Sequence, residues 1–210
     1  FMGIAQRAKN GQPLSQPLGS TLDFKDFQEL MFVPNMFPTP DGTEIDTRVV
    51  IGKNAKKPMI LPVPFMIAGM AYEASVSLPV KIVLARASPM VGTATNSGEA
   101  GFLKKERDIA KLYVVQYNRA GWGNAPEELR QADMVEIKLG QGASAGDGFK
   151  IGNKLIGDEL RKHLKLKEGE DAVMPTRFPD INNQDDLKRK VDQLREMTDG
   201  VPIAIKIAAG

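Results

Sequence analysis

Residues 112–139, LYVVQYNRAGWGNAPEELRQADMVEIKL, contain the pattern on which the fold prediction rests. Two short apolar runs, Leu112–Gln116 and Met134–Leu139, are separated by a polar loop that contains glycine and by a segment in which Pro126 suits a first helical turn. Short apolar runs that alternate with helices are typical of buried parallel strands. The stretch therefore predicts a strand–helix–strand unit of a parallel sheet.

The same alternation extends over much of the chain. We expect further strands at Thr47–Ile51, Pro64–Ala68, Met90–Thr95 and Ile203–Ala208. We expect helices at Pro79–Ala87, Pro126–Gln131 and Asn183–Asp199. In the last of these, Asn183 can cap the helix, and its apolar residues, Leu187, Val191, Leu194 and Met197, fall on one face.

Composition excludes several classes of site. The 210 residues include no cysteine, which rules out thiolate nucleophiles, cysteine-ligated zinc and iron–sulfur ligation within this sequence. A single histidine, His163, cannot form a two-histidine metal site, and we expect no metal. The 28 basic and 26 acidic residues give a net charge of +2, which does not by itself suggest nucleic-acid binding. The basic stretch Arg161–Lys167 lacks interleaved aromatic residues, so we expect a solvated helix face with His163 exposed.

The sequence also suggests a cellular compartment. No run reaches the roughly 18 apolar residues that a membrane span needs. The first residues, FMGIAQRAKNGQ, turn polar too soon for a signal peptide. We therefore expect a cytoplasmic protein.

Polar residues gather at or just after the carboxyl ends of the expected strands, where parallel sheets bind ligands. They are Gly69, Met70, Asn96, Glu99, Gln116, Arg119, Lys138, Gln141 and Lys206. Lys138 and Lys206 each lie inside an apolar run, EIKL and AIKI, and must be desolvated unless an anion meets them. One such lysine could belong to an edge strand, whereas two in separate strands favour a shared anionic ligand.

The glycine-rich loop Gly140–Gly148, GQGASAGDG, invites a dinucleotide-binding interpretation. Its spacing differs from GxGxxG, and no obvious amphipathic helix follows it. The alternatives are a loop that simply turns and a loop that lets the backbone approach a flat ligand closely.

Several blocks, taken in order, resemble the FMN-binding synthase domain of glutamate synthase, and most closely its short stand-alone relatives. The blocks are PFMIAGM, GTATNSGE, the VVQY segment with RAGWG and PEEL, ADMVEIKLGQGASAGDG and VPIAIKIAAG. The resemblance implies a (β/α)8 TIM barrel of the FMN-linked oxidoreductase type, of which roughly the first five strands are present. We therefore expect an N-terminal arm at 1–44 and part of an FMN-binding barrel at 45–210, completed by a further barrel segment or a partner chain.

The resemblance implies an enzyme that reduces 2-iminoglutarate, formed from 2-oxoglutarate and ammonia or an amino donor, to L-glutamate. Gly69, Met70 and Thr95 would lie at the flavin, Asn96 and Gln116 at its ring edge, and Lys138 and Lys206 near the ring or substrate. Lys138, Glu99 and Lys206 would be the catalytic residues. Glu99, Arg119 and Gln141 would face the 2-oxo acid, with Arg119 as the carboxylate clamp. Ferredoxin or another electron-donor subunit is a possible partner.

Three departures from the family pattern leave alternatives open. Glu73 and Ala100 replace glycines, and Phe178 in RFPD replaces a histidine. The chain could instead be a degenerate, non-catalytic flavin-binding or scaffold subunit. It could also be an FMN barrel enzyme that acts on another 2-oxo or hydroxy acid.

Overall fold

The computed structural model describes residues 33–141 and 150–208. The elements in chain order are β1 (Val49–Ile51), β2 (Met59–Leu61), α2 (Leu78–Val91), β3 (Thr95–Asn96), α3 (Lys104–Arg107), β4 (Tyr113–Tyr117), α4 (Pro126–Leu129), β5 (Met134–Lys138), β6 (Lys150–Ile151), the 3-10 helix η2 (Asn153–Leu155), α5 (Asp158–Leu164), β7 (Ala172–Val173), α6 (Gln184–Met197) and β8 (Ile203–Lys206).

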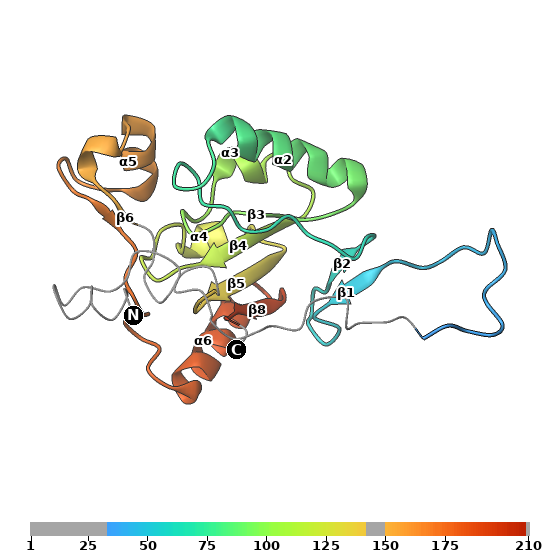
Figure 1. Cartoon of the computed structure of the whole chain (residues 1–210). Helices are drawn as coiled ribbons and strands as arrows, with labels where there is room; N and C mark the ends of the chain where they lie inside the picture. Colours follow the sequence, from blue (N-terminus) through green and yellow to red (C-terminus); the bar gives the residue numbers. More distant parts are fainter. Residues whose placement is uncertain (1–32, 142–149, 209–210) are drawn as a thin grey trace, which may run out of the picture.

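A four-stranded parallel sheet, in the order β3-β4-β5-β8, forms the centre of the molecule (Figure 1). The strand–helix–strand unit predicted for residues 112–139 is confirmed as β4, α4 and β5. Two antiparallel pairs, β1-β2 and β6-β7, lie outside this sheet. The described residues therefore form a mixed α/β fold, and they contain no closed barrel.

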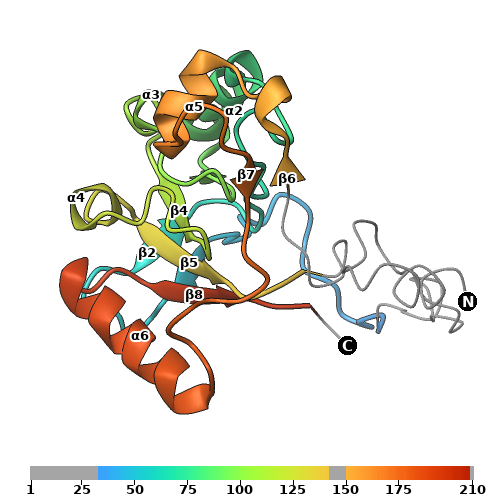
Figure 2. The same ribbon diagram turned by 90° about the vertical axis from the view of Figure 1, so that its left-hand side faces the viewer.

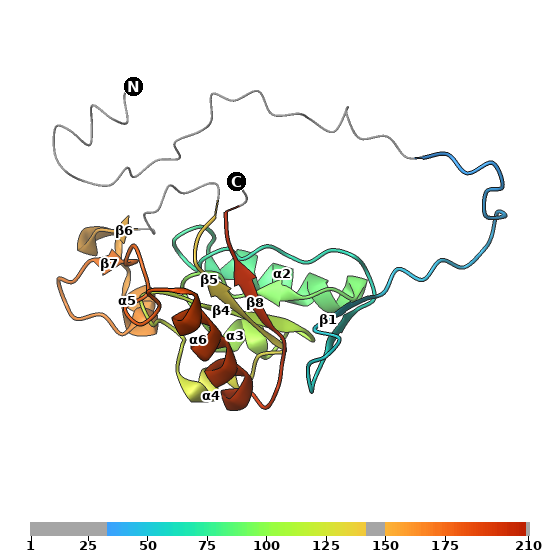
Figure 3. The same cartoon turned by 90° about the horizontal axis from the view of Figure 1, so that it is seen from below.

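The two faces of the sheet bury different groups, because successive side chains on a strand point to opposite faces. On the face that we call the helix face, Tyr113, Val115, Val135 and Ile137 pack with apolar residues of α2, α4 and α6. In Figure 2, α4 and α6 lie together on one side of β4, β5 and β8. Figure 3 shows α6 next to β8 and β5.

The opposite face, which we call the hairpin face, is apolar at the amino ends of the strands. Met59 and Leu61 of β2 pack there against Val114 of β4 and Met134 of β5. Gln116 of β4, and Glu136 and Lys138 of β5, lie nearer the carboxyl ends and point to the same face, because alternate residues of a strand share a face. The hairpin face thus changes from apolar to polar towards the carboxyl ends.

Two strand predictions are wrong in whole or in part. Pro64–Ala68 is not a strand, although the Ile67 N–H donates to the Ala94 carbonyl over 3.0 Å beside β3. Pro62, just before the run, and Pro64, its first residue, lack the N–H groups that hydrogen bonds between strands need. The predicted strand Met90–Thr95 reduces to β3, because α2 continues to Val91.

Helix α2 extends past Pro89 because the carbonyl left without a backbone donor is satisfied locally. A proline at position 89 removes the N–H that would reach the Ala85 carbonyl. The Ser88 hydroxyl donates to that carbonyl instead, over 3.1 Å. Gly92, in the left-handed region at φ 74°, then ends the helix.

Helix α6 follows its prediction closely. Asn183 is the N-cap, and its Oδ1 accepts the Asp186 N–H over 2.9 Å. Leu187, Val191, Leu194 and Met197 pack into the helix-face core. The sequence signals for capping and for one apolar face therefore coincide with the contacts.

The expectation that His163 is exposed is wrong. Its ring is half-buried on α5 and meets Tyr72 edge to face at a centroid distance of 5.4 Å. Its Nε2 lies 2.9 Å from the Ala100 carbonyl, a position in which it donates a hydrogen bond. Burial lowers the pKa of the imidazole, which favours its neutral form.

Other predictions fall partly outside the described residues. The N-terminal arm is described only from residue 33, and residues 33–44 are exposed and lead away from the sheet (Figure 3). Most of the loop Gly140–Gly148 lies outside the described residues. Among the helices of the described ranges, none combines the length and apolar character that crossing a bilayer requires.

Candidate functional site

Three polar side chains from neighbouring strands meet on the hairpin face. The Gln116 Nε2 group donates to Glu136 Oε1 over 2.5 Å, and the Asn96 Nδ2 group donates to the same oxygen over 3.3 Å. Asn96 Oδ1 in turn accepts the Gly98 N–H over 2.9 Å. The Gln116 Oε1 atom is buried and has no hydrogen-bond partner among the described residues. Buried amide oxygens in proteins almost always have a donor, so this atom is open to one from outside the described residues.

Gly69 brings the backbone close to these amides. A Cβ atom at position 69 would lie 2.9 Å from Asn96 Oδ1 and 3.0 Å from Gln116 Nε2. Such contacts are too short for any residue but glycine unless the amides move. The Gly69 backbone and the two amides therefore form one wall, where the sequence places the expected flavin residues.

Next to this wall lies a cluster of charges, which we call the Glu99 cluster: Glu99, Arg119, Lys138 and Lys206. The Lys138 Nζ lies 2.8 Å from Glu99 Oε2, and Arg119 Nη2 lies 3.5 Å from Glu99 Oε1. Lys138 and Lys206 are register partners on β5 and β8, so they project from the same face of the sheet. The two apolar-run lysines therefore lie at one position of the sheet, and the shared anionic ligand stays a prediction.

The Glu99 cluster holds more donors and acceptors than it pairs internally. Glu99 Oε1 and Arg119 Nε are buried without a hydrogen-bond partner in the described part of the chain. Arg119 also donates from Nη1 to the Thr176 carbonyl over 2.8 Å. Burial lowers the pKa of the Lys138 ammonium, and Lys206 and Arg119 act in the same direction while Glu99 opposes them. Two cations on one carboxylate, with a third, Lys206, beside Lys138, suit an additional anion.

Glu99 and Arg119 come from two loops that touch backbone to backbone. A Cβ atom at Gly101 would lie 2.1 Å from the Trp122 carbonyl oxygen, and one at Gly123 would lie 2.1 Å from the Phe102 nitrogen. Both glycines also have positive φ, at 79° and 67°. Asn118 shapes the second loop, because its Oδ1 accepts the Trp122 N–H over 3.2 Å. This contact between the two loops fixes the positions of Glu99 and Arg119 relative to each other.

The structure places the remaining expected site residues differently. Thr95 turns its hydroxyl to the helix face, where it donates to Glu106 Oε1 over 3.0 Å. The Met70 carbonyl accepts from Lys81 Nζ over 3.2 Å, so Met70 reaches the site through its backbone. Gln141 is half-buried beyond the end of β5.

Sequence reasoning missed three residues that shape the site. Glu136 joins Asn96 to Gln116, and its position two residues before Lys138 was the available signal, because alternate strand residues share a face. Lys81 and Glu106 form a buried ion pair of 2.9 Å behind the site. No local pattern in the sequence links a lysine in α2 to a glutamate in α3.

The departures from the family pattern lie away from the hairpin face. Glu73 is exposed at φ 58°, a left-handed conformation that suits glycine, and its Oε1 accepts the Leu78 N–H over 3.3 Å. Phe178 is buried on the helix face, where it stacks on Tyr117 at 5.6 Å. Ala100 is buried beside His163. None of the three side chains belongs to the Glu99 cluster.

The sequence is similar to one known family and to several individual proteins. A family model described as a conserved region in glutamate synthase matches residues 21–210. A glutamate synthase large subunit-like protein of Rhizobium meliloti is 39% identical over 187 residues, which cover 86% of this chain and 42% of that protein. An archaeal-type glutamate synthase [NADPH] of Thermotoga maritima is 28% identical over 236 aligned residues, which cover 100% of this chain and 46% of that protein.

A third relative, an archaeal glutamate synthase [NADPH] of Archaeoglobus fulgidus, is 31% identical over 192 residues, which cover 90% of this chain and 34% of that protein. The chain thus spans less than half the length of these relatives. The match of the family model over most of the sequence, together with the order of the site residues on the strands, shows that this chain belongs to the glutamate synthase family.

Proposed function

We propose that this chain forms part of an FMN-binding synthase domain that converts 2-oxoglutarate, through 2-iminoglutarate, to L-glutamate. The observation that carries the proposal is the polar end of the hairpin face, where an unpaired buried amide oxygen adjoins a cluster with three cations. Family membership supports the same reaction, since the similar proteins are named glutamate synthases.

The residues present fit FMN. The free Gln116 Oε1 can accept from an N–H of the flavin ring, and the Gly69 backbone leaves room for a flat ligand against the two amides. Lys138 and Lys206 supply positive charge beside that wall, the means by which proteins tune a flavin. When bound, FMN would supply the reducing electrons for the imine.

The Glu99 cluster would bind and protonate the substrate. Arg119 has a planar set of donors, of which Nε is free among the described groups, so it can receive a substrate carboxylate. Lys138 Nζ and Glu99 Oε2, 2.8 Å apart, form a pair that can hold a proton where the carbonyl oxygen leaves as water. The lowered pKa of Lys138 makes its ammonium a better proton donor than a solvent-exposed lysine.

Partners follow from the proposed reaction. Its substrates are 2-oxoglutarate and ammonia or an amino donor, and it needs an external source of electrons. One similar protein, of Pyropia yezoensis, is named a ferredoxin-dependent glutamate synthase, and it is 29% identical over 105 residues that cover 50% of this chain and 7% of that protein. This name favours ferredoxin as a donor, whereas the names of the archaeal-type relatives favour NADPH.

Further strands, from the same polypeptide or a partner, would complete the barrel, and a cytoplasmic location remains our prediction.

The degenerate, non-catalytic alternative loses its main argument. It rested on Glu73 and Phe178, and the structure places the first in solvent and the second in the helix-face core. Both substitutions leave the donors of the Glu99 cluster in place.

The test uses the complete natural gene product that contains this chain. We expect purified protein to release FMN on denaturation, and we expect 2-oxoglutarate to oxidise the reduced protein only when ammonia is present. Protein that is colourless and cannot be reconstituted with FMN would overturn the proposal. Oxidation by 2-oxoglutarate without ammonia, or by a different 2-oxo acid alone, would assign another reaction to the same site.

A variant tests the assigned clamp. We expect Arg119→Lys to raise the KM for 2-oxoglutarate by about tenfold, because lysine lacks the planar paired donors of arginine, while the FMN content stays at the wild-type level. Arg130→Lys, at an exposed arginine after α4, is the matched control. An unchanged KM in Arg119→Lys would place the clamp elsewhere.

A further inference from the structure

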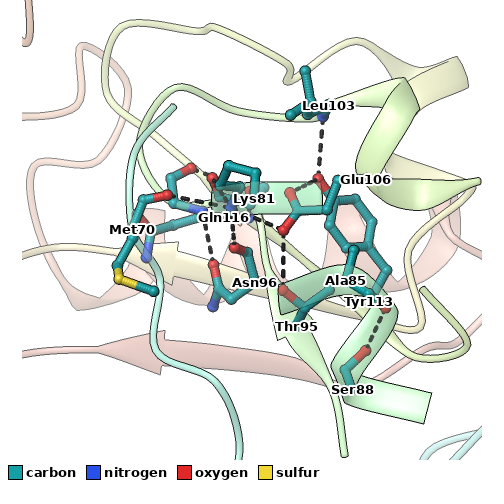
Figure 4. Close-up of polar contacts among 12 residues, drawn as sticks. Met70, Lys81, Ala85, Ser88, Thr95, Asn96, Leu103, Glu106, Tyr113 and Gln116 are labelled. Atoms are coloured by element: carbon teal, nitrogen blue, oxygen red, sulfur yellow. Dashed lines mark hydrogen bonds and ion pairs between the residues drawn. The ribbon is translucent and has the colours of Figure 1, made fainter. Parts of the chain in front are cut away.

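A second buried lysine lies directly behind the proposed flavin wall. Lys81, in the first turn of α2, is 2% exposed, and its Nζ lies 2.9 Å from Glu106 Oε1 of α3, which is 0% exposed (Figure 4). Glu106 Oε1 also accepts from Thr95 Oγ1 over 3.0 Å, and Oε2 accepts from the Tyr113 hydroxyl over 3.0 Å. The carboxylate is therefore fully engaged within the core.

The Lys81 ammonium also binds three backbone carbonyls. It donates to the carbonyls of Asn96 at 2.7 Å, Ser97 at 3.2 Å and Met70 at 3.2 Å. Asn96 ends β3 and Ser97 follows it, whereas Met70 belongs to the segment that follows Gly69. Figure 4 shows Lys81 between the Met70 and Asn96 groups and Glu106. One cation thus holds together two segments that are distant in sequence.

Each of these carbonyls adjoins a group of the proposed flavin wall. Met70 follows Gly69, whose backbone lies against the Asn96 and Gln116 amides. The Ser97 hydroxyl accepts the Gln116 N–H over 2.9 Å, so the end of β3 also sets the position of Gln116. A Cβ atom at Gly98 would lie 2.4 Å from the Met70 carbonyl carbon, which shows how closely the two segments pack. A shift of Met70 away from β3 would therefore open the wall.

Stability alone does not account for the Lys81–Glu106 pair. Burying two charges costs desolvation energy that their attraction roughly offsets, and apolar replacements of such pairs are often neutral or stabilising. Burial lowers the pKa of Lys81 and raises the pKa of Glu106, while each charge partly restores the other. An apolar pair could not supply N–H donors to the three carbonyls that Lys81 binds.

We propose that Lys81 is a positioning residue for the flavin site, which it shapes by holding the Met70 and Asn96 carbonyls together. The inference rests on the proposed function. Lys81 acts behind the wall, and Glu106 balances its buried charge.

The experiment compares variants of the complete gene product by their dissociation constant for FMN and by their urea unfolding midpoint. The main variant is Lys81→Met with Glu106→Gln, which leaves no unpaired charge in the core. We expect this double variant to fold and to bind FMN at least tenfold more weakly, with a changed visible circular dichroism band of the bound flavin. Glu106→Gln alone keeps the carbonyl contacts of Lys81, so we expect FMN binding within twofold of the wild type. Arg86→Met, at an exposed position of the same helix, controls for loss of charge.

The outcomes separate the two proposals. Wild-type protein that binds no FMN would refute the proposed function, and this inference with it. Wild-type protein that binds FMN, with an unchanged dissociation constant in the double variant, would refute the inference alone. If the double variant does not fold, Lys81→Gln with Glu106→Gln retains two N–H donors at position 81, so the inference predicts FMN affinity close to that of Glu106→Gln, and affinity at least tenfold weaker would contradict it.

Discussion

Within residues 33–141 and 150–208, two lysine–glutamate pairs lie in the interior, and their surroundings differ. The Lys81–Glu106 pair, at 2.9 Å, has a hydrogen-bond partner for both carboxylate oxygens and four partners for the ammonium. The Lys138–Glu99 pair, at 2.8 Å, lies beside polar atoms that the described residues leave unpaired. Since buried polar groups are almost always satisfied, the first pair is complete within the protein, whereas the second has atoms open to a further partner.

The largest expected effect concerns the complete pair. We expect Glu106→Ala to lower the free energy of unfolding by about 3–5 kcal/mol, because it leaves the Lys81 charge buried without a counterion. Urea unfolding measures this loss. Glu106→Gln, which retains acceptors or donors towards Thr95 and Tyr113, should lose less. A loss below about 1 kcal/mol in Glu106→Ala would erase the distinction between the two pairs.

We expect a substitution in the Lys138–Glu99 pair to change ligand binding more than the free energy of unfolding. We expect Lys138→Met to change the free energy of unfolding by less than about 1 kcal/mol, because Glu99 keeps its contact with Arg119 and a desolvated charge is removed. We expect FMN binding to weaken by about tenfold and the flavin reduction potential to become more negative, because a cation beside the ring is lost. A redox titration, with the exposed Lys111→Met as control, measures this. An unaltered potential would remove Lys138 from the flavin site.

The half-buried His163 gives the smallest effect. Its pKa is lowered in the folded state, so the unfolded chain binds more protons as the pH falls below about 6.5. The stabilising contribution of the neutral ring is complete above that pH and is lost as the pH drops towards the folded pKa. We expect acidification to destabilise the wild type more than His163→Gln, by at most about 1.4 kcal/mol for each unit of pKa difference.

Urea unfolding of both proteins between pH 7.5 and 5.5 isolates this contribution, because other groups titrate equally in both. Parallel stability curves for the two proteins would show that His163 is not shielded from water.

The sequence predicted the elements whose signals are local. Strand β5 and helix α6 have their own periodicity and caps, and the lysines in β5 and β8 pointed to one location because strand alternation is regular. The failures came from tertiary context. The Ser88 hydroxyl donates to the carbonyl that Pro89 leaves without a backbone donor, so α2 continues past Pro89. Lys81 lies in a helix whose sequence gives no indication that its ammonium would reach the end of β3.

The candidate site was predicted in part for the same reason. Residues at strand ends were identified correctly as neighbours, since the carboxyl ends of parallel strands meet. The direction of Thr95 was missed, because a strand as short as β3 gives too little alternation to tell its two faces apart. The position of Phe178 in the helix-face core depends on packing that one sequence does not reveal.

The contact between Gly101 and Gly123 holds the loops after β3 and β4 against each other. A side chain at either glycine would push the other loop aside, and with it Glu99 or Arg119. An insertion in one loop would therefore act on both halves of the charge cluster at once. Substitutions that aim to rearrange the Glu99 cluster should leave this loop contact intact and vary the residues on either side of it.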